Sequence, residues 1–146
     1  MSDSLSHWYC DVCAEKILKA EDGYVVWKDD QHHKSHTFKV IHQGKCDKDK
    51  SFSLSAALGD FLGADGLAYC LSFLSLGALK QAHGERHVRA GDLDEFVDFV
   101  RRMQTPNYEE ARRLFSAQSV IDDNSDSNEV GPYMQKQLLN LLTHKP

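Results

Sequence analysis

Three cysteines and one histidine form two closely spaced pairs in the first third of the chain. Cys10 and Cys13 make a Cys-x2-Cys pair, and His42 and Cys46 make a His-x3-Cys pair. A Cys-x2-Cys turn lets two thiolates converge on one ion, and four nitrogen and sulfur ligands suit tetrahedral zinc. Magnesium and calcium prefer oxygen ligands, so this ligand set disfavours them. The spacing therefore predicts a zinc site made of these four residues.

The stretch between the two ligand pairs predicts a β-hairpin. Two runs rich in β-branched and aromatic residues, 24–27 and 37–41, are separated by the polar segment 28–36. Such runs are typical of two paired strands with a connecting loop. The 28 residues from 14 to 41 suffice for a hairpin that leaves the metal and returns to it. The predicted element and the ligand spacing therefore agree.

The two pairs and the hairpin resemble zinc-ribbon and treble-clef modules, in which a Cys-x2-Cys knuckle and a second ligand pair enclose zinc. The resemblance covers residues 7–50 and is generic, so it names no particular family. It implies a structural metal and a role in binding nucleic acid or protein. Zinc ribbons commonly carry a second Cys-x2-Cys, so the histidine of the second pair has alternatives. His32, His33 or His36 in the predicted hairpin tip could replace His42.

Other interpretations of the cysteines remain open at this point. The paired cysteines could be ordinary buried thiols, with His42 at a strand end by chance. Cys70 lies among apolar residues of a predicted helix and is interpreted as a small core residue. A metal with four protein ligands has no open coordination position, so such a site would stabilise the module and would not activate water.

Composition and pattern divide the chain into four segments. They are a zinc-binding β-hairpin module (1–50), a helical core (51–120), an acidic mobile loop (121–131) and a C-terminal helix (132–146). The hydrophobic period changes from two to about 3.6 after residue 50, which indicates helices. The predicted fold is α+β, with the zinc-bound β-hairpin module packed on a mainly α-helical body. The predicted helices span 56–62, 66–76, 93–103, 107–116 and 132–146.

Two of the predicted helices carry specific expectations. Helix 66–76 is apolar nearly all round, so we expect it at the centre of the core, with Asp65 as its cap. Asp92 and Glu95 form a capping box that begins the next helix. The two arginines in the last turn of that helix, at positions 101 and 102, suit the helix dipole.

Size and charge restrict the function. A chain of 146 residues with 41% hydrophobic residues can bury one ordinary core, which excludes a large multidomain enzyme. A net charge of −5 argues against a protein whose main task is to wrap a nucleic-acid backbone. The N-terminal residues Met1 to Ser6 are polar, and the apolar stretch 67–79 is too short to span a membrane. We therefore expect a cytoplasmic protein with reduced thiols.

The favoured function is a small non-enzymatic interaction or adaptor protein with a structural zinc and a protein partner. The C-terminal helix could also form a homodimer. One alternative is a zinc-dependent nucleic-acid-binding regulator, because aromatic and lysine side chains accompany each other in residues 8–50, although aspartates are interleaved with them. A further alternative is a small metal-dependent hydrolase-like enzyme that uses His83, Glu85 and His87. No catalytic or cofactor-binding residue is predicted under the favoured function.

Overall fold

The computed structural model describes residues 5–82 and 88–145. The chain divides into two compact units. The main unit comprises residues 6–104, and the C-terminal unit comprises residues 105–145 together with Leu5. Both sheets and helices are present, so the α+β class predicted from the sequence is confirmed.

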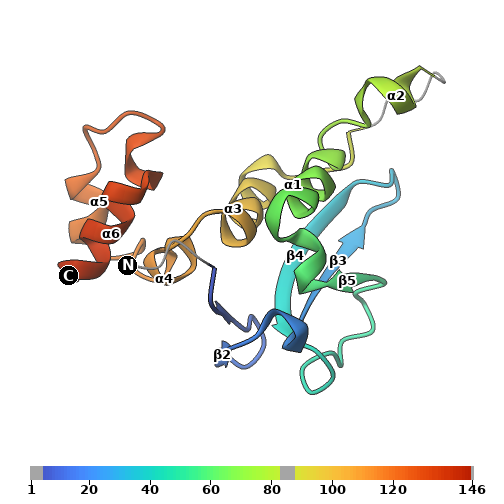
Figure 1. Ribbon diagram of the computed structural model, residues 1–146, viewed down its shortest axis with the longest axis horizontal. Helices are drawn as coiled ribbons and strands as arrows, with labels where there is room; N and C mark the ends of the chain where they lie inside the picture. Colours follow the sequence, from blue (N-terminus) through green and yellow to red (C-terminus); the bar gives the residue numbers. More distant parts are fainter. Residues whose placement is uncertain (1–4, 83–87, 146) are drawn as a thin grey trace. The chain divides into compact units, whose positions relative to one another are not determined.

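An antiparallel three-stranded sheet with the order β4-β3-β5 forms the centre of the main unit (Figure 1). Strand β3 spans Gly23–Asp29, β4 spans Ser35–His42 and β5 spans Leu54–Ala57. Strands β3 and β4 form the predicted hairpin, in which Val25 lies opposite Val40. The prediction of the hairpin is confirmed, and both strands are longer than the hydrophobic runs that indicated them.

The prediction of a helix over residues 56–62 is wrong. Residues up to Ala57 belong to β5, which pairs with β3 so that Ala56 lies opposite Val25. Leu58–Phe61 then form the short 3-10 helix η2. Alanine and leucine favour helices, but this preference is weak, and pairing with the open edge of β3 overrides it.

Helix α1 (Gly63–Ser72) packs against helix α3 (Leu93–Gln104), and α3 also contacts β4 (Figure 1). The short helix α2 (Gly77–Gln81) follows α1 along the chain. Helix α1 begins before Asp65 and shows no side-chain cap. The expectation that it is buried on all sides is wrong, because Leu71 is 52% exposed although Cys70 is buried. A Cβ atom at Gly66 would collide with the backbone carbonyl of Phe61, so glycine permits the close approach of η2 and α1.

Six aromatic side chains form the core between the sheet and these helices. Phe38 of β4 stacks on Phe99 of α3 with ring centroids 4.9 Å apart, and its ring also lies 5.5 Å from that of Phe73. Such pairs contribute about 0.5–1.5 kcal/mol beyond the burial of their area. The aromatic core consists of Trp27, Phe38, Phe61, Phe73, Phe96 and Phe99.

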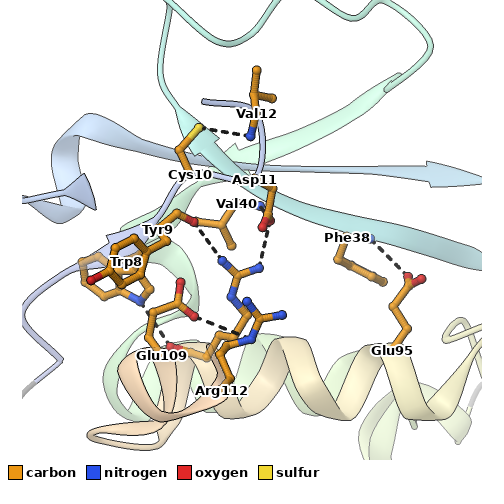
Figure 2. Close-up of polar contacts among 11 residues, drawn as sticks. Trp8, Tyr9, Cys10, Asp11, Val12, Phe38, Val40, Glu95, Glu109 and Arg112 are labelled. Atoms are coloured by element: carbon orange, nitrogen blue, oxygen red, sulfur yellow. Dashed lines mark hydrogen bonds and ion pairs between the residues drawn. The ribbon is translucent and has the colours of Figure 1, made fainter. Parts of the chain in front are cut away.

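The start of α3 connects to a β-bulge in β4. Asp92 Oδ1 accepts a hydrogen bond from the Glu95 N–H at 3.1 Å, as a capping box requires. The Glu95 carboxylate, however, accepts from the Phe38 N–H at 3.2 Å (Figure 2). The pairing of β3 and β4 shifts register at this point, and the preceding residue, Thr37, has a φ of 57°. The Glu95 side chain therefore satisfies an amide of the irregular strand.

The C-terminal unit contains α4 (Tyr108–Arg112), α5 (Gln118–Asp123), the 3-10 helix η3 (Gly131–Tyr133) and α6 (Gln135–Thr143). Helix α5 occupies the first residues of the segment predicted as an acidic loop, so that boundary is wrong. Leu138 of α6 is buried with Tyr108 and Ala111, which shows that the apolar stripe of α6 packs within this unit. No helix in the described chain is long and apolar enough to cross a membrane.

The aromatic core provides a test of how the main unit is stabilised. We expect Phe73→Ala to lower the free energy of unfolding by about 3–5 kcal/mol, because Phe73 is fully buried and its loss leaves a cavity. Leu79→Ala is the control, since Leu79 is 88% exposed and its substitution should change stability by less than about 0.5 kcal/mol. Urea denaturation monitored by circular dichroism measures both. Equal stabilities of the two variants would contradict the assignment of the core.

Candidate metal centre

The Cys10–Cys13 pair lies in a tight turn between two short strands. Strand β1 (Trp8–Tyr9) pairs antiparallel with β2 (Lys16–Ile17), and residues 10–15 connect them as a knuckle. The Ala14 N–H donates to the Cys10 carbonyl at 2.9 Å, which closes the turn. The Val12 N–H points at Cys10 Sγ at 3.4 Å. The knuckle thus directs a backbone dipole toward a thiolate, as a metal-binding turn requires.

The second pair lies where β4 ends. His42 is the last residue of β4, and the chain then turns back through Gly44, which has a φ of 82°. Glycine adopts this left-handed conformation at little cost. The Asp47 N–H donates to the Gly44 carbonyl at 3.3 Å, so the turn places Cys46 beside His42.

The ligand atoms of Cys10, Cys13, His42 and Cys46 all lie within 4.8 Å of one another. His42 Nδ1 is 3.4 Å from Cys13 Sγ and 3.7 Å from Cys46 Sγ. A tetrahedral zinc with Zn–S bonds near 2.3 Å and Zn–N bonds near 2.0 Å separates sulfur and nitrogen ligands by about 3.5 Å. The arrangement therefore fits a single metal ion.

A hydrogen bond determines which ring nitrogen of His42 faces the sulfurs. His42 Nε2 lies 3.0 Å from the carbonyl oxygen of Lys16 in β2. A carbonyl can only accept, so Nε2–H donates to it, which leaves Nδ1 facing the sulfurs as the nitrogen that would bind a metal. Histidines that bind metals commonly donate their other N–H to a carbonyl in this way. The contact also ties the end of β4 to β2.

Burial and hydrogen bonds perturb the thiols in opposite directions. Burial acts to raise the pKa of the Cys10 thiol, but N–H groups of Cys13 and Val12 and contacts with His42 outweigh it and lower the pKa to about 6. Burial, with contributions from Cys10 and Cys13, raises the pKa of Cys46 to about 11. Cys10 and Cys46 are buried, whereas Cys13 is exposed. In the absence of metal the Cys10 thiol therefore ionises at a lower pH than the Cys46 thiol, and metal binding must release protons.

The structure brings the four predicted residues together, with His42 as the histidine of the cluster. In the described chain the hairpin-tip histidines are not part of this group, and His36 Nδ1 instead lies 2.8 Å from Thr37 Oγ1. Cys70 is buried in α1, where burial raises its pKa to about 11. The segment that contains the candidate catalytic residues His83, Glu85 and His87 lies outside the described residues.

Two residues that the sequence interpretation missed hold the knuckle in place. Arg102 in the last turn of α3 is only 3% exposed, and its Nη1 lies 2.8 Å from Asp11 Oδ2. The same carboxylate oxygen accepts from the Val40 N–H at 2.7 Å. Figure 2 shows Tyr9, Asp11 and Val40 gathered at this contact. Interpreting Arg102 through the helix dipole alone was therefore incomplete; the acidic residue between the two cysteines was the one local signal.

The chain matches no protein-family model, and comparison with curated proteins and with solved structures finds no significant similarity. The geometry of the cluster is therefore the basis for assigning a function.

The knuckle contains a strained alanine that allows a test of its geometry. Ala14 has a φ of 66°, a conformation that costs about 1–2 kcal/mol for residues other than glycine. Because glycine loses some of this gain through its greater freedom when unfolded, we expect Ala14→Gly to stabilise the protein by about 0.5–1 kcal/mol. The control is Ala56→Gly in β5, which should destabilise it by about 0.5–1 kcal/mol. Urea midpoints that fall for both variants would argue against this knuckle conformation.

Proposed function

We propose that this protein is a small non-enzymatic interaction protein built around one structural zinc, with Cys10, Cys13, His42 and Cys46 as its ligands. The observation that carries the proposal is the convergence of three sulfurs and one imidazole nitrogen within 4.8 Å. Thiolates and imidazole favour zinc over magnesium or calcium. Four protein ligands leave no position for a substrate or water, so the metal stabilises structure. The proposed module is of the zinc-ribbon or treble-clef kind.

The metal would hold the segment between β4 and β5 against the sheet. Between β4 and β5 the chain runs through residues 43–53, which contain no helix or strand. Val26 and Ile41 are each only 3% exposed, and with Phe52 and Cys46 they line a pocket of about 110 Å³. Zinc at Cys46 would hold this segment against the strands and keep these apolar residues covered.

Exposed apolar side chains next to the cluster support a protein as partner. Val12 at the tip of the knuckle is 63% exposed, and Leu18 after β2 is 69% exposed. Lys45, next to the site, forms an ion pair within the chain, with its Nζ 3.3 Å from Glu15 Oε2. Together with the net charge of −5, this local pairing favours a protein surface over a nucleic-acid backbone.

The metal assignment is tested by metal content and one ligand variant. We expect one zinc per chain, and we expect Cys13→Ser to weaken zinc binding by about 100- to 1000-fold. Apparent binding free energies of about 10–16 kcal/mol, shared among four ligands, give about 2.5–4 kcal/mol each. Elemental analysis and competition with a chromophoric chelator provide the measurements.

Cys70→Ala is the matched control for the ligand variant. It should keep the metal and cost on the order of 1 kcal/mol of stability, because Cys70 is a buried core residue apart from the cluster. A chain that purifies without metal and cannot be loaded with zinc would refute the proposal. Loss of metal in Cys70→Ala would refute the ligand assignment.

The interaction role is tested with peptides selected by display on the zinc-loaded protein. Peptides that bind through the knuckle should lose at least about tenfold in affinity for Val12→Asp, because a charge would replace an exposed apolar contact. Val130→Asp is the control, since Val130 of the C-terminal unit is 55% exposed. Titration calorimetry gives the affinities. Binding that is insensitive to Val12→Asp, or selection that yields no binding peptide, would count against a protein-binding knuckle.

A further inference from the structure

We propose that Arg102 is a positioning residue of the metal centre, which strengthens zinc binding by holding the knuckle at the edge of β4. Arg102 acts through Tyr9 and Asp11, the two residues that flank Cys10. The inference rests on the proposed function, because it concerns the affinity of the same site.

The guanidinium of Arg102 binds Tyr9 and Asp11, the residues on both sides of Cys10. Its Nη2 donates to the Tyr9 carbonyl at 3.0 Å, and its Nη1 lies 2.8 Å from the Asp11 carboxylate. A planar guanidinium presents its donors in a fixed fork, so two such contacts orient the backbone that carries Cys10. The Trp8 Nε1–H also donates to the Arg102 carbonyl at 3.2 Å, which fastens β1 to the end of α3.

The same contact reaches the other half of the metal site. Asp11 exchanges two hydrogen bonds with Val40: its N–H donates to the Val40 carbonyl at 2.7 Å, and its Oδ2 accepts from the Val40 N–H at 2.7 Å. Val40 lies two residues before His42 in β4. Arg102 thus stabilises the Asp11 side chain, which joins the knuckle to the strand that ends at His42.

The contacts that join Arg102, Asp11 and Val40 lower the free-energy cost of bringing the two ligand pairs together. Zinc binding requires the two ligand pairs to be ordered relative to each other, and a joint that is already formed reduces the entropy lost in the binding step. Coupling between two sites is reciprocal, so bound zinc must also stabilise the contacts of Arg102. Helix α3 is therefore expected to respond to metal although none of its residues is a ligand.

The test compares Arg102→Met and Arg102→Lys with the unaltered full chain. We expect Arg102→Met to weaken zinc binding by about tenfold, the lower end of the effect seen when groups that support metal ligands are removed. Lysine keeps the charge but lacks the fork, so Arg102→Lys should recover only part of the affinity. The visible absorption bands of the Co²⁺-loaded variants should keep their positions, because the ligands are unchanged. Affinities come from chelator competition.

A second measurement separates positioning from a general loss of stability. The drop in urea midpoint on adding a chelator should be smaller for Arg102→Met than for the unaltered chain, because part of the stabilisation by zinc passes through Arg102. Asp11→Asn should behave like Arg102→Met. If Arg102→Met fails to fold, Asp11→Asn takes its place in the test. Arg113→Met, which removes a contact of 3.6 Å to Glu110, is the control and should leave zinc affinity unchanged.

The outcomes distinguish this inference from the proposed function. If the unaltered chain binds no zinc, the proposed function fails. If it binds zinc, and Arg102→Met and Asp11→Asn bind it equally well, Arg102 has no positioning role while the metal centre stands. An equal chelator-induced drop in the variants and the unaltered chain would also overturn the inference, because it would show a purely structural contact.

Discussion

Four ligand atoms must converge on one point, and in this chain they come from two backbone turns that 28 residues separate. Each turn can form locally, but neither can place its pair next to the other. The sheet and the β1–β2 ladder supply that placement, because β4 delivers His42 to a position where its Nε2 meets the carbonyl of Lys16. The candidate metal site therefore depends on strand register as much as on the identity of its ligands.

The features that the sequence predicted well are those encoded by neighbouring residues. The ligand pairs, the hairpin and the start of α3 at Asp92 all rest on spacings of a few residues, and the structure confirms the hairpin and brings the pairs together. The features that were missed join distant segments. Arg102 and Asp11 are 91 positions apart, and the acidic residue between the two cysteines does not by itself indicate which distant cation it pairs with. Glu95 likewise serves an amide of β4 instead of completing its own capping box.

Two expectations about helices were wrong, each for its own physical reason: the helix over 56–62 and the complete burial of α1. Residues 56 and 57 have helical preferences, and α1 has apolar residues around its whole circumference. Local preference amounts to less than about 1 kcal/mol per residue, so an unpaired edge of β3 suffices to recruit β5. In α1, glycine at position 66 allows one side to approach Phe61 closely, while Leu67 and Leu71 remain substantially exposed. An apolar circumference therefore does not establish burial on every side.

The proposed metal has a physical rationale in how unevenly the main unit is stabilised. Six aromatic rings consolidate the sheet against α1 and α3, whereas the knuckle and residues 43–53 have short ladders, turns and exposed polar side chains. Ordering such segments costs conformational entropy of about 1–2 kcal/mol per residue. The proposed closed zinc site would add stabilisation at one point, and Arg102 joins the knuckle beside that point to α3. On this proposal a bound metal would hold the knuckle in one conformation next to the main unit, and the exposed Val12 at the tip of the knuckle would be held with it.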